Sequence, residues 1–321
     1  MAQRNYPLIV GVILGLIILF FAVFGSRLAP HDPMEVFSDL IRIDDEIFSP
    51  ARQPVPPLRL DEFLLGTDNA GRDLFSRLMW AIRPTLILCL IIASSRILLG
   101  VGLGMIAGWY GGTTRRVIDT LISVCLAVPI LLFALATISF IGERELSTFM
   151  VALVATGWAG TAVYVKNSTE IIKQAPYIDG ARAIGVPPLG ILRNYVFPQL
   201  WPALPALISF ELAATLLVIA ELGFLGMFIG EAFIMTIEDP SGGGVIPVGM
   251  TAHFPELAQM ASDFWSKMIR SPWELAIVGL VIFLTIFTFN ILGEGMRQYM
   301  DVTRPRLFRR RKPEGDFLEI E

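Results

Sequence analysis

Apolar residues gather in six long runs along this chain, and shorter stretches between them hold most of the charged residues. A helix needs about 20 mostly apolar residues to cross a bilayer. Six segments meet that length, namely 7–25, about 84–110, about 117–141, about 147–165, about 200–230 and about 272–293. The pattern predicts an all-α, polytopic membrane protein with six transmembrane helices.

The composition agrees with this prediction and excludes other classes. Hydrophobic residues make up 54% of the 321 residues, charged residues make up 17%, and the mean hydropathy is +0.65. Soluble domains carry about 25% charged residues, so a soluble enzyme and a disordered chain are both excluded. The net charge of -4 gives no basic footprint for nucleic acid as a partner.

The placement of lysine and arginine predicts the orientation in the cytoplasmic membrane. With a cytoplasmic N-terminus, 14 of the 25 Lys and Arg residues fall in the predicted cytoplasmic stretches, which are 1–6, 111–116, 166–199 and 294–321. Short cytoplasmic loops are enriched in these residues, so we expect both termini, including the tail 300–321, to be cytoplasmic. The run at 7–25 is longer than the apolar part of a signal peptide, which favours a retained first helix.

Two polar stretches fall outside the membrane in this orientation. The proline-rich stretch 26–83 predicts an irregular external segment. The stretch 231–271 contains the run EDPSGGG, which favours a loop. The residues that follow, FPELAQMASDFWSKM, favour a short helix at the surface.

The stretch 176–198, PYIDGARAIGVPPLGILRNYVFP, is too polar and too broken to cross a membrane. Residues 179–184 favour a short helix, and Gly185 allows a left-handed turn. The proline pair at 187–188 is typical of the first turn of a second helix, and Pro198 is expected to end this element. The predicted helix–turn–helix is either an amphipathic element at the membrane interface or a docking element for a cytoplasmic partner.

A resemblance favours the docking element. The stretch is similar to the EAA loop of ATP-binding-cassette (ABC) importer permeases, in which E-A-A is followed at fixed offsets by Gly, Ile and Pro. The matching residues are Asp179, Gly180 and Ala181 in the place of E-A-A, then Gly185, Ile191 and Pro198. Gly180 lowers helix propensity by about 1 kcal/mol relative to alanine. The resemblance implies that these residues, together with Arg182, couple the chain to an ATPase.

A second motif lies at 65–86, LGTDNAGRDLFSRLMWAIRPTL. It resembles the pattern LGTD-x-x-GRD-x-x-SR-x-x-x-G-x-R-x-SL, which precedes the second span in dipeptide, oligopeptide and nickel permeases. Ala81 replaces a glycine of that pattern, and Thr85 replaces a serine. The residues that match are Leu65, Gly66, Thr67, Asp68, Gly71, Arg72, Asp73, Ser76, Arg77 and Arg83. We refer to residues 65–77 as the hallmark loop.

The residue types of the hallmark loop allow two interpretations. Gly, Asn and Asp at 66–71 are typical of a turn, and Asp68 and Asp73 have three arginines near them in the sequence. Surface charges usually serve structure or solvation, which favours a hydrogen-bonded cap over the external helix ends. The alternative is an external gate that touches the substrate.

Three shorter stretches agree with the same family, namely AGWYGG at 107–112, AELGFLG at 220–226 and FNILGEGMRQYMD at 289–301. The resemblance to the C-type permeases of dipeptide and oligopeptide importers implies a permease core over 84–299 and transport by alternating access. It also implies the partners, which are a homologous second permease, two cytoplasmic ATPases that bind ATP and Mg²⁺, an external substrate-binding protein and membrane lipid.

Three charged residues, Arg96, Glu211 and Glu221, fall inside predicted spans. Charge is costly in lipid, so each of these side chains is expected to face protein or water. They either line a translocation path or form satisfied polar pairs. Glu211 lies deeper in its span than Glu221 and is the stronger path candidate, and Arg96 can pair with either glutamate.

No pattern in the sequence predicts catalysis by this chain. The sequence contains no GxxxxGK[ST] and no HExxH, so ATP hydrolysis is expected in partner subunits alone. His31 and His253 are isolated in the sequence, and a metal site needs clustered ligands. We therefore expect both histidines to face solvent, and we expect neither a metal nor a cofactor in this chain.

Two alternatives remain open at this point. Within the same family, nickel or another small solute is an alternative to peptides. In a different class, a self-contained secondary carrier or channel would transport without ATPases. The broken stretch 176–198 and the lack of an inverted repeat of hydropathy argue against the carrier. A membrane-anchored structural protein does not account for Glu211 within a span.

Overall fold

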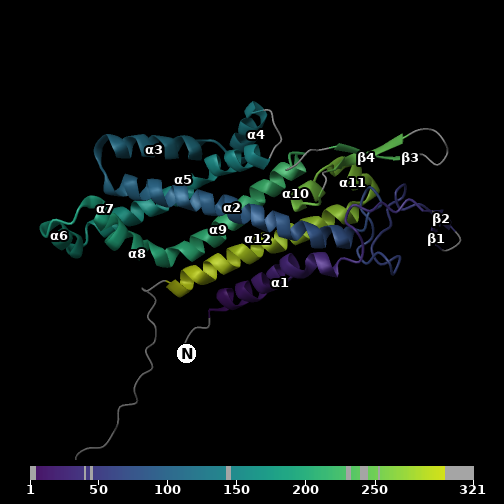
Figure 1. Cartoon of the computed structure of the whole chain (residues 1–321), viewed down its shortest axis with the longest axis horizontal. Coiled ribbons are helices and arrows are strands. Elements are labelled where there is room, and N and C mark those ends of the chain that lie inside the picture. The colour runs from purple at the N-terminus through teal and green to yellow at the C-terminus, as the bar shows by residue number, and fades with distance from the viewer. Residues whose placement is uncertain are drawn as a thin grey trace, which may run out of the picture.

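The computed structural model describes residues 5–39, 41–43, 46–141, 146–228, 233–238, 245–251 and 254–300. His253 and the tail beyond Met300 lie outside these residues. Long helices run side by side in an elongated bundle (Figure 1). They are α1 (Tyr6–Leu28), α2 (Leu74–Trp109), α5 (Leu146–Lys173), α9 (Leu204–Phe224) and α12 (Pro272–Met300). The predicted all-α class is confirmed.

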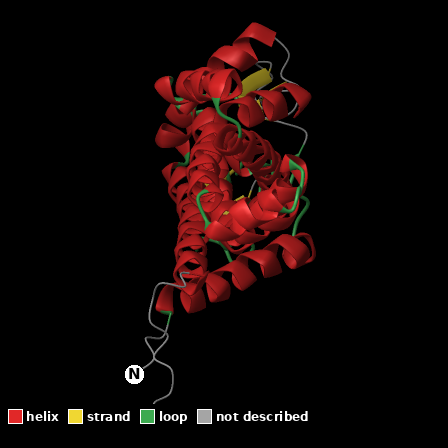
Figure 2. Cartoon of the chain, turned by 90° about the vertical axis from the view of Figure 1, so that its left-hand side faces the viewer, coloured by secondary structure: helices red, strands yellow, loops and turns green. Residues whose placement is uncertain are grey.

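The bundle has two distinct ends. The short helices α6 (Pro176–Ala183) and α7 (Pro188–Ile191) lie at one end, which we call the α6 end. The strands and the start of α2 lie at the opposite end, which we call the hallmark end (Figure 1). Figure 2 looks along the bundle from the α6 end and shows the long helices packed around one another.

The third predicted span, 117–141, is not one straight helix. Its residues form α3 (Gly112–Ala127) and α4 (Ile130–Ile141), which are bent by 96° relative to each other. The break falls at Val128, whose backbone is extended at φ -101° and ψ 130°. The residue before a proline is disfavoured in helical geometry, so Pro129 explains the break. The described residues thus hold five helical stretches that are long and apolar enough to cross a membrane, or six if the bent pair counts as one span.

Helices α2 and α5 meet through three glycines of α2 that are spaced four residues apart. A Cβ added at Gly104 would lie 2.7 Å from the Ala162 carbonyl oxygen, and one at Gly108 would lie 2.6 Å from the Lys166 carbonyl oxygen. At Gly100 it would lie 2.9 Å from a backbone oxygen of α5. Small residues at this spacing let helix backbones approach closely inside a membrane. We call this contact the glycine seam.

Helix α1 packs along α12, so the start of one lies beside the end of the other. The Asn5 amide donates a 2.7 Å hydrogen bond to the Gly295 carbonyl. A Cβ at Gly295 would lie 2.4 Å from Leu8, and one at Gly11 would lie 2.8 Å from Leu292. The start of α1 and the end of α12 both point toward the α6 end (Figure 1).

The helical path after α7 continues into α9, so the prediction that Pro198 ends the element is wrong. A π-helical turn (Leu192–Val196), α8 (Phe197–Leu200) and a 3-10 turn (Trp201–Ala203) join the two helices. Pro198 stands in the first turn of α8. Proline is tolerated there because its missing N–H is not needed, and the wider turn before it absorbs the change in hydrogen bonding.

Two antiparallel strand pairs lie in the connecting segments of the hallmark end. Strand β1 (Ile41–Ile43) pairs with β2 (Glu46–Phe48), and β3 (Phe233–Glu238) pairs with β4 (Val245–Thr251). The second pair corrects the prediction of a plain loop over 231–271. β-branched residues within 233–251 favour strands, and the glycine run lies between them. Two short helices follow, α10 (Leu257–Met260) and α11 (Phe264–Arg270).

Candidate functional site

The hallmark loop folds back on itself at two glycines. Gly66 has φ +74° and Gly71 has φ +78°, a backbone region that favours glycine. A Cβ at Gly71 would lie 2.4 Å from the backbone nitrogen of Ala51. Thr67 forms a bridge with Asp73 and accepts a 2.7 Å hydrogen bond from the Val55 N–H through its hydroxyl. The loop is therefore a tight turn held against the segment before it.

Asp68 is the centre of a buried group of charges. One carboxylate oxygen accepts hydrogen bonds from the N–H groups of Ala70 and Arg72, each at 2.9 Å. The other lies 2.8 Å from Arg72 Nε and 3.1 Å from Arg77 Nη1. All three charged side chains are buried. Burial raises the pKa of Asp68, but the nearby charges of Arg72 and Arg77 lower it by more. The pKa of Asp68 therefore lies below its ordinary value.

Asp73 caps the first turn of α2. Its carboxylate accepts hydrogen bonds from the N–H of Phe75 at 3.3 Å and from the N–H of Ser76 at 3.0 Å. Carboxylates at this position satisfy free N–H groups and oppose the helix dipole. The Ser76 hydroxyl accepts a 3.1 Å hydrogen bond from the backbone N–H of His31. Asp73 and Ser76 thus fix the start of α2.

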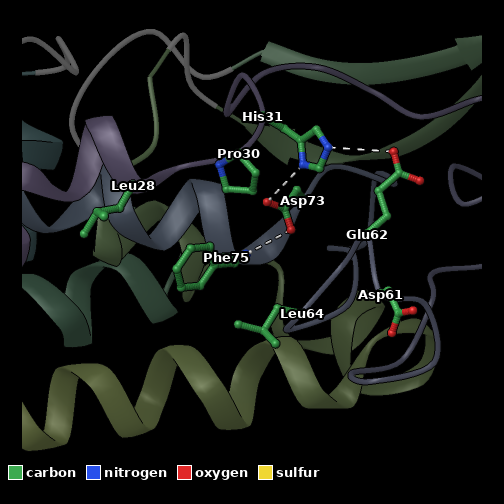
Figure 3. Close-up of a pocket in the computed structure, with 8 residues that line it drawn as sticks. All are labelled: Leu28, Pro30, His31, Asp61, Glu62, Leu64, Asp73 and Phe75. Atoms are coloured by element: carbon green, nitrogen blue, oxygen red, sulfur yellow. Dashed lines mark hydrogen bonds and ion pairs between the residues drawn. The ribbon is translucent and has the colours of Figure 1, made fainter.

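His31 lies beside this cap, so the prediction that it faces solvent is wrong. Its Nδ1 lies 3.5 Å from Asp73, its Nε2 lies 3.8 Å from Glu62, and its side chain is 19% exposed. Its ring meets the Phe37 ring edge-on at 5.1 Å. Figure 3 shows the imidazole between the two carboxylates. The surrounding hollow of about 390 Å³ is lined by Leu28, Pro30, His31, Asp61, Glu62, Leu64, Asp73 and Phe75.

The structure adds partners for the hallmark loop that the sequence analysis missed. Arg77 Nη2 donates a 2.8 Å hydrogen bond to Gln259. The backbone N–H of Asn69 donates at 2.9 Å to Glu274, which also pairs with Lys267 at 2.8 Å. The sequence 271–274, SPWE, is typical of a capped helix start, but nothing local indicates that its glutamate binds the hallmark loop.

Arg96 and Glu211 form the central charged pair of the bundle. Arg96 is fully buried, and its Nη1 lies 3.8 Å from Glu211 and 3.1 Å from the Thr215 hydroxyl. Its Nε donates a 2.7 Å hydrogen bond to the Leu153 carbonyl. A Cβ at Gly157 would lie 2.1 Å from the guanidinium carbon, so glycine leaves room for it. The pair joins α2, α5 and α9.

The predicted charges of α9 therefore separate into two groups. Glu211 accepts a 3.2 Å hydrogen bond from Thr161 of α5, and its side chain is 11% exposed. Glu221 lies ten residues further along α9, which is about 15 Å at 1.5 Å per residue. Of the two glutamates, Glu211 is the partner of Arg96.

At the α6 end, α6 and α7 form a protruding helix pair. Gly185 takes φ +83° between them, as predicted, and a Cβ there would meet nothing within 4 Å. Ile184 and Leu189 beside the turn are 77% and 74% exposed. Two of the residues matched to the EAA pattern, Ala181 and Ile191, are buried against the body of the protein. Three others, Asp179, Gly180 and Pro198, are exposed. Arg182 lies 3.1 Å from Asp179.

Apart from Glu221, the predicted site residues form three separate groups. The hallmark loop and the α6–α7 pair lie at opposite ends of α2 and the bundle, and the Arg96–Glu211 pair lies between them. Helix α2 has 36 residues, which corresponds to about 54 Å. A polar assembly therefore lies at each end of the apolar helices, and the Arg96–Glu211 pair lies within the bundle.

Residues 100–302 match the family model described as "Binding-protein-dependent transport system inner membrane component". The chain belongs to this family. It is thus a membrane component of a transport system.

Curated relatives match nearly the whole chain. One is the glutathione transport system permease protein GsiD of Pectobacterium atrosepticum, with 26% identity over 93% of this chain and 87% of the relative. Another is the dipeptide transport system permease protein DppC of Escherichia coli K12, with 29% identity over 93% of this chain and 90% of the relative. Haemophilus influenzae DppC is 25% identical over 93% of this chain and 91% of its own length.

A solved structure shares the fold. A chain from an inward-facing structure of the MetNI methionine ABC transporter aligns with a TM-score of 0.50 and 14% identity. The alignment covers 70% of this chain and 96% of that chain. The two chains therefore share one arrangement of helices over the aligned part.

Proposed function

We propose that this chain is one of two permease subunits in an ATP-driven importer that carries di- or oligopeptides across the cytoplasmic membrane by alternating access. The observation that carries the proposal is the α6–α7 pair. Its buried face anchors it to the long helices, and its exposed tip presents Ile184 and Leu189 on either side of Gly185. Exposed apolar side chains on an ordered protrusion are typical of a protein contact.

The α6 end is the cytoplasmic side in this proposal, and the hallmark end is the external side. Two observations support this orientation. The predicted cytoplasmic stretches carry most of the lysine and arginine residues. The start of α1 and the end of α12 also point toward the α6 end, which agrees with two cytoplasmic termini.

The partners follow from the family and from the residues of this chain. The sequence has no phosphate-binding GxxxxGK[ST] loop, and in this proposal two cytoplasmic ATPases supply the ATP and Mg²⁺ chemistry. One binds the α6–α7 pair of this chain, and the other binds the equivalent loop of a homologous second permease. An external binding protein delivers the substrate to the hallmark end.

In this mechanism, closure of the ATPases on ATP displaces α6 and α7 as a unit. Gly185 sets the angle between the two helices because its left-handed backbone is strained for other residues. The displacement opens the path only if ATP binding favours the state in which the path opens to one side of the membrane over the state in which it opens to the other. We assign Glu211 to the path because part of its carboxylate is exposed. We assign Arg96, and Glu221 at the external end of α9, to positions beside the path.

The hallmark loop acts in this proposal as the external frame of the path. The residues assigned to this frame are Gly66, Thr67, Asp68, Gly71, Arg72, Asp73, Ser76 and Arg77. Most of their polar groups are occupied by other groups of this chain. This supports a structural cap over the helix ends and not direct contact with substrate.

The proposal is tested by purifying the tagged chain in mild detergent with its partners and reconstituting the complex in liposomes. ATP-dependent uptake of a labelled dipeptide, absent without the binding protein, is the expected result. Uptake of nickel in place of the dipeptide would leave the class intact and overturn the peptide substrate. Solute movement by the chain alone without ATP would overturn the proposal in favour of a carrier.

A further inference from the structure

Trp109 is the last residue of α2, and it joins that helix to α6. The residue is 6% exposed. It packs in one apolar cluster with Ile178 and Ala181 from α6 and with Ile191 from α7. The end of α2 and the buried face of the α6–α7 pair therefore belong to one apolar cluster.

Two cations also hold the Trp109 ring. The guanidinium carbon of Arg182 lies 5.1 Å from the ring centroid, and Lys173 Nζ lies 5.6 Å from it. Both distances fit a cation–π contact. Lys173 Nζ additionally donates a 2.7 Å hydrogen bond to the Trp109 carbonyl. A cation is stabilising at this place because the carbonyl end of a helix carries partial negative charge. The ring is thus fixed from α5 by Lys173 and from α6 by Arg182.

A hollow lies beside this contact. It has a volume of about 410 Å³ and is lined by Gly108, Arg115, Glu170, Lys173, Gln174, Asp179 and Arg182. Space between α6 and the ends of α2 and α5 leaves α6 room to shift. Lys173 and Arg182, the two cations that contact the Trp109 ring, both line this hollow.

Helix α2 connects Trp109 to the other two groups of charges. It is one continuous helix from Leu74 to Trp109, it carries Arg96 along its length, and Asp73 caps its start. The glycine seam binds it to α5 through close backbone contacts. A shift delivered at Trp109 therefore reaches the Arg96 region along the helix, and Pro84 lies between Arg96 and the hallmark end.

We propose that Trp109 is a positioning residue that transmits the displacement of α6 to α2, and that Arg182 acts on α2 of its own chain. The inference rests on the proposed function. It changes the role that the resemblance implied for Arg182, because the guanidinium faces the Trp109 ring and Asp179 of its own helix.

The test uses the whole complex in liposomes and measures the number of dipeptide molecules imported per ATP hydrolysed. The variants are W109L, R182Q and the double variant. W109L removes the ring but keeps the carbonyl that Lys173 binds. Each single variant is expected to lower the ratio about 5- to 10-fold, in the range of typical coupling energies, while ATP hydrolysis continues. The double variant is expected to be no worse than either single variant.

The conservative variant W109F retains an aromatic face and is expected to restore most of the ratio. The matched control is W80L, because Trp80 lies on the same helix, is 43% exposed and has no ring or cation contact among the described interactions. If W109L does not assemble, the comparison of R182Q with W109F carries the test, since the Arg182 side chain is 42% exposed.

An unchanged ratio in W109L or R182Q would overturn the inference. So would additive losses in the double variant, because they would place Arg182 on a separate contact such as the ATPase. Failure of the unmodified complex to import the dipeptide with ATP would overturn the proposed function itself. The two failures are therefore distinguishable.

Discussion

At the residue scale, the hallmark loop depends on charges that are removed from solvent. Asp68 is 1% exposed and accepts hydrogen bonds from two backbone N–H groups and from Arg72, and it pairs with Arg77. Removing one member of a buried ion pair leaves an uncompensated charge, which costs more than the pair contributed. The loop therefore tolerates loss of a charge less well than a surface pair does.

Asp68→Asn is expected to destabilise the chain by about 3–5 kcal/mol, because it leaves Arg72 and Arg77 buried without their carboxylate. The measurement is thermal unfolding of the purified complex in detergent. The control is Glu294→Gln, which removes a pair in which Arg297 is 66% exposed and is expected to change stability by less than about 1 kcal/mol. Equal effects of the two substitutions would contradict the prediction.

The lowered pKa of Asp68 gives a second prediction, on pH dependence. A carboxyl whose pKa is lower in the folded state stabilises the fold above its unfolded value of 3.8, and this contribution is lost as the pH falls through the folded value. The stability difference between the unmodified chain and Asp68→Asn is therefore expected to be constant near neutral pH and to shrink in acid. A difference that grows in acid would contradict it. Thermal unfolding from pH 7 to pH 3 provides the check.

At the element scale, the glycine seam determines how closely α2 and α5 approach. Gly100, Gly104 and Gly108 each leave no space for a Cβ against the backbone or side chains of α5. Lipid gives little hydrophobic drive for helix association, so close packing supplies it. The seam also keeps Arg96 beside the Leu153 carbonyl of α5.

Gly104→Leu is expected to destabilise the fold by about 1–3 kcal/mol or to prevent assembly, because overpacking forces the two backbones apart. Gly102→Leu is the matched control on the same helix, since a Cβ there meets nothing within 4 Å. Thermal unfolding and the yield of assembled complex are the measurements. A loss of stability in Gly102→Leu as large as in Gly104→Leu would show that the effect comes from α2 itself and not from the seam.

At the scale of the whole molecule, the three groups of charged residues are arranged along one axis. The hallmark loop lies at one end, the α6–α7 pair at the other, and Arg96 with Glu211 between them. Each span satisfies its own backbone hydrogen bonds within the helix, so the ends are the places where irregular and polar structure is allowed. This arrangement suits a path that opens alternately at each end.

The proposed orientation predicts which end reacts with a membrane-impermeant thiol reagent in intact cells. In a Cys125→Ser background, in which Cys89 remains buried, Glu62→Cys is expected to be labelled from outside because the Glu62 side chain is 57% exposed. Ile184 is 77% exposed at the opposite end, and the Ile184→Cys variant is expected to react only after permeabilisation. The reverse pattern would overturn the orientation.

Much of this protein was predictable because its signals are local. The six apolar runs indicate the helices and the all-α class, since each run is long enough to cross a bilayer as a helix that satisfies its backbone hydrogen bonds within its own segment. Gly185 indicates its left-handed turn, confirmed at φ +83°. The seam glycines recur every four residues, a local spacing that by itself favours a close helix contact in a membrane.

The tertiary structure alone decided which distant residues meet. Arg77 and Gln259 are 182 positions apart, and Arg96 meets Thr215 across 119 positions. No periodicity encodes such contacts, because they depend on how whole helices pack. The same holds for Pro198, where neighbouring turns absorb the proline. The sequence by itself thus determined the helices, the membrane class and the local turns, whereas packing decided the charge partners, since helix formation needs near neighbours and ion pairing needs only proximity in space.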